Sequence, residues 1–228
     1  MSEFRNEIKY LVSEGQLALI GSRISGLMKK DTHTDSGGTY TVRSLYFDDY
    51  YDKCYAENIN GTEPREKFRI RIYNGDKSYI SLECKRKEHG LTKKTACPLT
   101  EEQCRALMRG ASPPITSDAP PVLCKLITEM QVHLLRPKII VEYERTPFVC
   151  AMGNVRVTFD RNISSSGDIG NFLSREISKR PIMQTGEHIL EVKWDEFIPD
   201  EIFSALAIEN PERTSFSKYA LCRKYSER

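Results

Sequence analysis

Charged residues recur at every second position in several short segments of this chain. Arg5, Glu7 and Lys9 have this spacing, and so do Arg69 and Arg71. Residues two apart in a β-strand point to the same face of the sheet, so each segment would place its charges side by side. Most of these charges are positive, and such a composition is suited to a site that binds an anion.

The basic residues on these faces outnumber the acidic ones. The candidates for one shared cavity are Arg5, Lys9, Arg69, Arg71, Lys85, Lys87, Arg145, Arg156 and Lys193, with Lys94 and Lys218 as further members. Burying several cations in one cavity costs free energy unless negative charges compensate them. A phosphate chain supplies that charge, because Arg binds phosphate oxygens through two donors and Lys adds a point charge. We therefore predict a phosphate-binding cavity.

Three carboxylates share the same faces, namely Glu7, Glu83 and Glu191. Mg²⁺ or Mn²⁺ is commonly held by one or two carboxylates together with phosphate oxygens. The combination predicts phosphoryl transfer, which depends mainly on positioning and on charge neutralisation. The alternative is a set of solvated strand faces with cross-strand ion pairs, which is the usual meaning of a single such run. Repetition of the pattern along the chain favours one cavity.

The elements that must carry these residues are mostly strands. We expect eight, at residues 4–12, 41–47, 66–73, 78–87, 91–98, 138–146, 154–161 and 189–194. They follow one another in hairpins, so the expected fold class is α+β with an antiparallel sheet. A closed antiparallel β-barrel, with a charged tunnel inside and an apolar exterior covered by flanking helices, would account for both faces of the strands.

Helices are expected between and after the strands. Ser13 and Thr100 each stand three residues before a Gln, a capping-box pattern that predicts the start of a helix. Further helices are expected at 122–134, 199–207 and 216–225, whereas 162–179 shows no regular pattern. The length of the chain fits a single domain spanning 1–228.

The composition narrows the class of protein. A formal net charge of +2 argues against a general nucleic-acid-binding surface. The seven cysteines are scattered and form no C-x-x-C pair, so we expect free thiols in a reducing cytoplasm rather than zinc or disulfides. We see neither a signal peptide nor an apolar stretch long enough to span a bilayer, and expect a cytoplasmic protein that would need a partner protein for any membrane role.

The ordered series of motifs resembles a known family, the VTC domain of the vacuolar transporter chaperone. This family belongs to the triphosphate tunnel metalloenzyme, or CYTH-like, superfamily. The matching segments are 4–10 (FRNEIKY), 44–48 (SLYFD), 68–73 (FRIRIY), 83–87 (ECKRK), 142–148 (EYERTPF), 156–160 (RVTFD), 190–193 (LEVK) and 216–219 (FSKY). They run in family order and cover almost the whole chain.

The resemblance implies a barrel whose lumen is a tunnel for triphosphate or polyphosphate, with Mn²⁺ or Mg²⁺ as cofactor. In the VTC branch the implied activity is polyphosphate synthesis, in which the γ-phosphate of ATP is added to a growing chain and ADP is released. ATP and polyphosphate or triphosphate are the expected partners, and nucleic acid is not.

Carried over to this sequence, the resemblance implies a set of site residues. Phosphate contacts are implied for Lys9, Arg69, Arg71, Lys85, Lys94, Arg145, Arg156 and Lys218. Tyr143 and Ser217 would contribute hydroxyl groups, and Glu191 would hold the metal, with Glu7 as the second candidate. The residues expected to act on the reacting phosphates are Lys9, Arg69, Arg71, Glu191 and Lys218.

One motif departs from the superfamily pattern. The N-terminal E-x-E-x-K is represented here by Arg5, Glu7 and Lys9. Loss of the first Glu removes a metal ligand used by the triphosphatase branches, which favours the VTC branch. The chain has no counterpart of the SPX domain or membrane segments of the eukaryotic complex, so it resembles the free-standing bacterial form.

Two other functions stay open at this point. The first is a triphosphatase acting on inorganic triphosphate, a nucleoside triphosphate or an RNA 5′ end. The second is a non-catalytic module that binds polyphosphate or a phosphorylated partner. The sequence leaves the preferred metal, the primer, the oligomeric state and a possible membrane partner undetermined.

Overall fold

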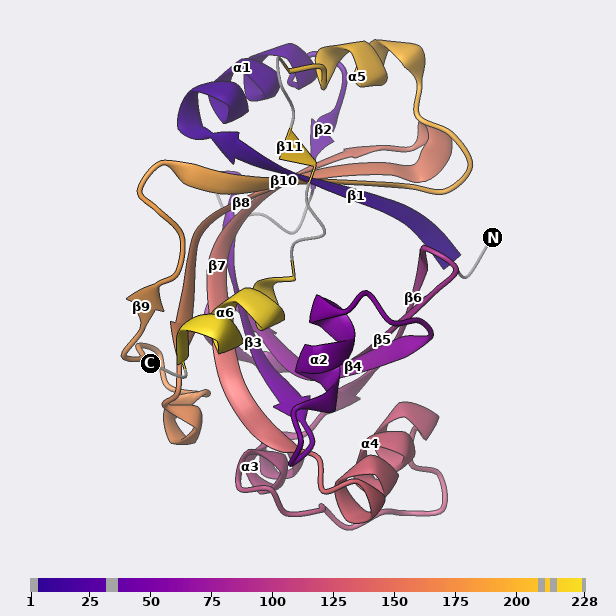
Figure 1. Cartoon of the computed structure of the whole chain (residues 1–228), viewed down its shortest axis with the longest axis vertical. Coiled ribbons are helices and arrows are strands. Elements are labelled where there is room, and N and C mark those ends of the chain that lie inside the picture. Colours follow the sequence, from indigo (N-terminus) through magenta and orange to yellow (C-terminus); the bar gives the residue numbers. More distant parts are fainter. Residues whose placement is uncertain (1–3, 32–36, 209–211, 214–216, 227–228) are drawn as a thin grey trace.

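Eight long antiparallel strands close into a barrel in the computed structural model, which describes residues 4–31, 37–208, 212–213 and 217–226 (Figure 1). The barrel strands are β1 (Phe4–Ser13), β3 (Tyr40–Asp48), β4 (Arg65–Tyr73), β5 (Asp76–Glu88), β6 (Leu91–Leu99), β7 (Arg136–Cys150), β8 (Val155–Ser166) and β10 (Glu187–Trp194). Their spatial order is β7-β3-β4-β5-β6-β1-β10-β8, and pairing of β8 with β7 closes the sheet. The predicted α+β barrel is confirmed.

Helices flank the barrel, and short strands extend its sheet. The helices are α1 (Glu14–Ile24), α2 (Lys53–Ile59), α3 (Glu101–Met108), α4 (Pro121–Val132), α5 (Asp200–Ala205) and α6 (Lys218–Ser226), with the 3₁₀ turns η1 (Met152–Asn154) and η2 (Ile169–Asn171). The short strands are β2 (Lys29–Lys30), β9 (Arg180–Pro181) and β11 (Glu212–Arg213). The predicted capping boxes at Ser13 and Thr100 both form. Phe216, where the last helix was expected to begin, lies outside the described residues.

Strand β8 continues to Ser166, beyond the end at 161 that the sequence pattern predicted. Asn162 has a positive φ of 52°, and the register between β7 and β8 shifts between Glu142 and Glu144. Beyond this irregularity, Ser164 pairs with Glu142 and its hydroxyl donates to the Glu142 carbonyl at 3.2 Å. Serine has little intrinsic strand preference, so pairing with β7 rather than local sequence stabilises this extension.

The apolar positions of the strands point outward and are covered by helices. On the side of α3 and α4, Ile70 and Leu82 are fully buried in one cluster with Leu107 and Leu126. On the side of α1 and α5, Leu17 and Ile20 pack with Val157, Leu190 and Val192. Figure 1 shows these helix pairs at opposite ends of the molecule. Because the apolar face is occupied outside, the alternate face with its charges lines the lumen.

Asp48, at the end of β3, joins two further helices to the barrel. Its Oδ1 accepts hydrogen bonds from the N–H groups of Asp49 and Cys54 at 2.9 and 2.8 Å. Its Oδ2 accepts from the N–H of Tyr55 at 3.0 Å and from the Tyr219 hydroxyl. The carboxylate is 1% exposed, so it holds α2 and α6 from a buried position. Both helices contact each other and reach the lumen from the same side (Figure 1).

We expect Asp48→Ala to lower the free energy of unfolding by about 3 kcal/mol, because it leaves several buried donors without an acceptor. Tyr219→Phe, which removes a single donor, should cost about 1 kcal/mol. Urea denaturation followed by circular dichroism measures both. Equal effects of the two substitutions would show that Asp48 is not the shared anchor of α2 and α6.

Candidate functional site

The barrel encloses a cavity of about 860 Å³, which we call the tunnel. Its lining comes from lumen-facing positions of all eight barrel strands and from the ends of α2 and α6. Every residue predicted to contact phosphate or metal lines the tunnel, namely Arg5, Glu7, Lys9, Arg69, Arg71, Lys85, Lys87, Lys94, Tyr143, Arg145, Arg156, Glu191, Lys193, Ser217 and Lys218. The structure thus brings the whole set together, while the role of each residue stays a prediction.

Strand register alternates cations with carboxylates on one wall of the tunnel. In the antiparallel pair β1–β10, Lys9 lies opposite Glu191, and Glu7 lies opposite Lys193. The next pair, β10–β8, places Lys193 opposite Arg156. The opposite charges that face each other across β1 and β10 stabilise this wall, whereas the like charges of Lys193 and Arg156 repel each other.

Glu7 and Glu191 contact the same two lysines. Lys9 Nζ lies 3.0 Å from a carboxylate oxygen of Glu7 and 3.6 Å from one of Glu191. Lys193 Nζ lies 3.7 and 3.0 Å from the same two groups. Burial alone would raise the pKa of both carboxyl groups, but the surrounding cations bring it well below its ordinary value. Both groups are therefore ionised at neutral pH.

A second cluster joins β7, β8 and α6. Arg145 donates two hydrogen bonds to Asp160, at 2.6 and 2.7 Å, and also lies 3.3 Å from Glu191. Lys218, the first residue of α6, places its Nζ 2.6 Å from Asp160. Both cations also lie over the ring of Tyr143, at 5.1 and 4.7 Å from its centroid. Asp160 therefore fixes the orientation of two predicted phosphate ligands.

A third cluster lies on β4 and β5. Arg69 donates to Glu83 at 2.7 Å and to the Tyr46 hydroxyl at 3.1 Å. Arg71 lies 3.6 Å from the same carboxylate, and Lys94 lies 3.3 Å from it. Burial would raise the pKa of Glu83, but these three cations hold it far below its usual range. One ionised carboxylate thus compensates part of three positive charges.

The sequence analysis missed several residues of the site. Arg65 and Lys67 line the tunnel and share the alternate spacing of Arg69 and Arg71, so the same pattern could have identified them. Asp160 lies four residues after Arg156 on β8, so the alternation of the strand places both side chains on the lumen face. The tyrosines of the lining, Tyr40, Tyr46 and Tyr73, and Asn58 of α2 carried no such signal.

The charge balance of the tunnel is positive. Its lining contains thirteen basic residues: Arg5, Lys9, Arg65, Lys67, Arg69, Arg71, Lys85, Lys87, Lys94, Arg145, Arg156, Lys193 and Lys218. The acidic residues of that lining are Glu7 and Glu191, and further carboxylates pair with lining cations from outside it, namely Asp31, Glu63, Glu83, Asp160 and Asp195. An enclosed excess of positive charge favours a polyanion, since the low-dielectric walls focus the field.

The carboxylates allow a test of the implied metal. Among the described residues, no group of three or more Asp, Glu, His or Cys side chains is arranged to hold an ion. Glu7 and Glu191 nevertheless form an ionised pair bridged by shared lysines. Mg²⁺ and Mn²⁺ are often bound by one or two carboxylates with phosphate oxygens completing the coordination. The residues therefore fit a divalent cation that binds together with phosphate.

Comparison with known proteins agrees with this geometry. The family model of the VTC domain matches residues 4–226. This chain belongs to the VTC domain family. The match extends over all eight barrel strands, so the tunnel described above is the tunnel of a VTC domain. No curated protein matches the sequence significantly.

Solved structures share the fold of this VTC domain at low sequence identity. A "putative adenylate cyclase" from Vibrio parahaemolyticus is 8% identical with a TM-score of 0.52, covering 98% of this chain and 99% of that chain. The PH1012 protein from Pyrococcus horikoshii is 12% identical with a TM-score of 0.51, covering 95% and 98%. The Mimivirus capping enzyme triphosphatase matches at 10% identity over 89% and 90%, and its TM-score of 0.33 is too low for comparing sites.

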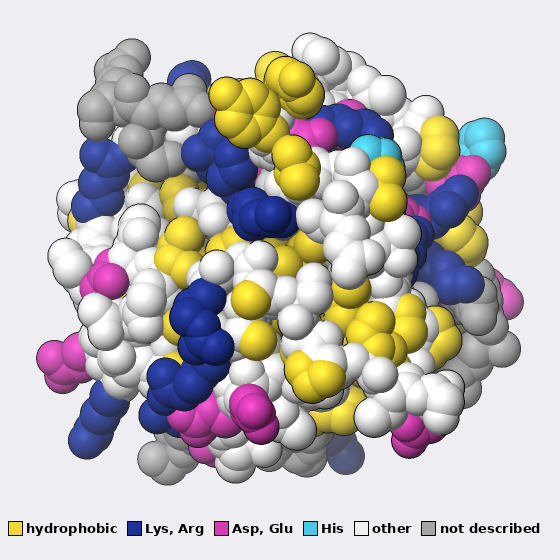
Figure 2. Space-filling model, turned by 90° about the horizontal axis from the view of Figure 1, so that it is seen from below, with side chains coloured by type: hydrophobic (Ala, Val, Ile, Leu, Met, Phe, Trp, Pro, Cys, Tyr) yellow, Lys and Arg dark blue, Asp and Glu magenta, His cyan; other side chains and the backbone are white. Residues whose placement is uncertain are grey.

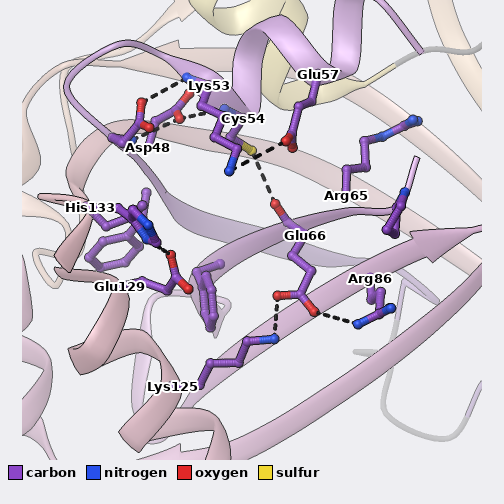
Figure 3. Close-up of a pocket in the computed structure, with 15 residues that line it drawn as sticks. Asp48, Lys53, Cys54, Glu57, Arg65, Glu66, Arg86, Lys125, Glu129 and His133 are labelled. Carbon is purple, nitrogen blue, oxygen red and sulfur yellow. Dashed lines mark hydrogen bonds and ion pairs between the residues drawn. The ribbon is translucent and has the colours of Figure 1, made fainter. Parts of the chain in front are cut away.

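A smaller cavity of about 310 Å³ lies between α2, α4 and the start of β4 (Figure 3). Its charges are paired with one another. Glu66 lies 2.5 Å from Lys125 and 3.5 Å from Arg86, and Glu129 lies 2.7 Å from His133. Arg65 lines both cavities. Because acids and bases balance here, this cavity is a poorer candidate for a polyanion than the tunnel of the VTC domain.

The outer surface contrasts with the tunnel. On the described residues of the face shown in Figure 2, Lys and Arg side chains form small separate groups between hydrophobic and neutral ones. No described helix of this VTC domain is both long enough and apolar enough to cross a membrane.

We expect acid to destabilise the VTC domain below about pH 5. The carboxyl groups of Glu7, Glu83, Asp160 and Glu191 have lowered pKa values in the fold, whereas the unfolded chain binds protons near the ordinary values of about 4. Their stabilisation is therefore complete above those ordinary values and is lost as the pH falls toward the folded pKa values.

Thermal unfolding between about pH 6 and about pH 3 measures this effect. Glu83→Gln should make the melting temperature depend less on pH, since it removes one of the carboxyl groups with a lowered pKa. Glu144→Gln, on the exposed side of β7, is the matched control and should leave the profile unchanged. A melting temperature that is constant over this range would contradict the ion-pair account of the tunnel.

Proposed function

We propose that this VTC domain is a metal-dependent phosphotransferase that extends polyphosphate with the γ-phosphate of ATP. A terminal phosphate oxygen of the chain would attack the γ-phosphorus. The bond from this phosphorus to the oxygen that bridges it to the β-phosphate would break, and ADP would leave with that oxygen. The product is a chain longer by one phosphate, and the reaction needs no nucleophile from the protein.

The observation that carries the proposal is the enclosed cluster of thirteen basic residues next to two ionised carboxylates. Phosphoryl transfer is accelerated mainly by positioning and by stabilising charge on phosphate oxygens. A tunnel of about 860 Å³ can hold several phosphates at once, which an acceptor chain and a triphosphate donor require. Membership of the VTC family supports the same chemistry.

The proposed roles follow from the contacts of each side chain. Arg69 and Arg71 would hold oxygens of the transferred phosphate, because Glu83 and Tyr46 already fix their guanidinium groups. Arg145 would neutralise the leaving diphosphate, held in orientation by its two bonds to Asp160. Such preorganisation lowers the reorganisation needed at the moment of reaction.

Several cations would exchange one partner for another on binding. Lys9 and Lys193 are each shared by the carboxylates of Glu7 and Glu191, so a phosphate must compete with these ion pairs. This competition moderates the affinity of a densely positive tunnel for a polyanion. Moderate affinity suits a polymerase, since the product chain has to advance after each addition.

Glu191 and Glu7 would hold Mn²⁺ or Mg²⁺ with oxygens of the bound phosphates, and the cation would withdraw charge from the transferred phosphoryl group. Arg5, at the position of the missing superfamily Glu, lies 2.7 Å from Asp195 and donates to the Asn154 carbonyl. A cation at this position disfavours the hydrolytic two-metal arrangement. We place the reaction in the cytoplasm, and export of its product would need a membrane partner.

Wild-type protein incubated with ATP, Mn²⁺ and a short polyphosphate primer should lengthen the primer and release a matching amount of ADP. Gel separation and ³¹P NMR measure the two products. Glu191→Gln should reduce the rate by at least about a hundredfold, since it removes the proposed metal ligand. Glu144→Gln is the control at an exposed position on β7. Free phosphate without chain growth would assign a triphosphatase, and binding without turnover would assign a binding module.

Arg71→Glu should abolish binding of inorganic tripolyphosphate, because it places a negative charge beside Glu83 in the tunnel wall. Arg71→Met removes the charge without reversing it and should weaken binding about tenfold or more. Calorimetric titration measures both. Arg86→Glu, on the outward side of β5 beside Glu66, tests for a non-specific charge effect and should bind nearly as wild type. Unchanged affinity of both Arg71 variants would exclude the β4 face of the tunnel as a phosphate site.

A further inference from the structure

Three lysines lie in one register row across the tunnel wall. Lys67 of β4 pairs with Lys85 of β5, and Lys85 pairs with Lys94 of β6. Like charges at directly opposite positions destabilise a sheet unless they are compensated. Lys85 Nζ lies 2.8 Å from Glu7, and Lys94 Nζ lies 3.3 Å from Glu83. Two members of the row thus have a carboxylate partner.

Lys67 differs from the other two lysines in its contacts. Its Nζ donates to Asn58 Oδ1 of α2 at 2.8 Å and to Ser217 Oγ, just before α6, at 3.1 Å. Both acceptors are neutral, and within the described residues no carboxylate lies at ion-pair distance from this amino group. Among the described residues, Lys67 therefore contributes a half-buried charge to the tunnel that no carboxylate compensates.

The groups around Lys67 reinforce this difference. Lys85 of β5, Lys9 of β1 and Arg65 of β4 are like charges, and besides the neutral Asn58 amide α2 contributes the Cys54 thiol as its titratable group. Burial, together with these cations, lowers the pKa of Lys67 to about 7. Near neutral pH, a substantial fraction of the amino group is therefore unprotonated in the free protein.

We propose that Lys67 is a further phosphate-binding residue, whose counter-charge comes from the substrate and which takes up a proton when a phosphate chain binds. An adjacent anion favours the charged amine, so binding shifts a neutral amine to an ammonium ion that donates to a phosphate oxygen. The inference rests on the proposed function only in requiring that the tunnel binds a phosphate chain. Because phosphate binding requires a protonated Lys67, the affinity for the phosphate chain should fall as the pH rises above about 7.

The test is calorimetric titration of the protein with inorganic tripolyphosphate, without ATP, at about pH 7.5 in two buffers of different ionisation enthalpy. The dependence of the heat on the buffer gives the number of protons taken up. Lys67→Met should weaken binding about tenfold and reduce the uptake. Lys67→Arg stays charged at this pH, so it should retain most of the affinity but also reduce the uptake.

Two comparisons isolate the effect of Lys67. The pKa of Lys85 is also lowered to about 7, chiefly by burial, so the informative quantity is the difference in proton uptake between wild type and each Lys67 variant. Lys77→Met, at an exposed lysine 3.9 Å from Glu101, is the control and should behave as wild type.

Stability of the free protein separates phosphate binding from a structural role. Lys67→Met removes a half-buried charge that faces other cations and no described carboxylate, so its melting temperature should rise in the absence of phosphate while its stabilisation by tripolyphosphate falls. A lower melting temperature with unchanged affinity and proton uptake would overturn the proposal and make Lys67 a tether for α2 and α6. If wild type itself failed to bind tripolyphosphate, the proposed function would fail and this inference with it.

Discussion

Compensation of positive charge inside a closed sheet is the constraint on which this structure depends. When the outward-facing side chains of a closed barrel are apolar, the side chains on the other face of each strand are enclosed in the lumen. Here that face carries cations, and Glu7, Glu83, Asp160 and Glu191 offset part of their repulsion. These carboxylates lower the free-energy cost of closing the barrel around its cations. Because they do not offset all of the charge, the tunnel retains an attraction for polyanions.

The helices contribute to the site in two different ways. The pairs α1–α5 and α3–α4 cover apolar strand faces and leave the lumen untouched. By contrast, α2 and α6 deliver side chains into the lumen, and Asp48 holds both of them from one buried carboxylate. Lys218 stands next to Tyr219, the residue that Asp48 binds, and its amino group reaches Asp160, so a carboxylate outside the tunnel lining helps to position a side chain inside it.

Much of the fold and of the site could be predicted from the sequence because strand periodicity is insensitive to strand ends. An error of a few residues in the end of a strand does not change which residues share a face. Arg69 and Arg71 were therefore assigned to the lumen even though the expected ends were inexact. Arg65 and Lys67 lie on the same face of this strand, but they were missed because the family motif begins after them, at Phe68. Which carboxylate meets which cation could not be predicted, because it depends on register between distant strands and on the docking of α6. The continuation of β8 beyond 161 was missed since its serines have little strand preference.

The pairing of β1 with β10 has a consequence for how the molecule acquires its structure. Lys9 faces Glu191 across this pair, so strands far apart in the chain must meet before the barrel can close. Contacts of such long sequence separation carry a large loop-closure entropy and are typical of slow-folding topologies. The contact of Lys9 with Glu191 therefore forms only when β1 meets β10, whereas Glu83 and Asp160 meet Arg69 and Arg145 within local hairpins. A polyanion that recognises the closed barrel would then act chiefly by retarding its opening, and would do little to speed its formation.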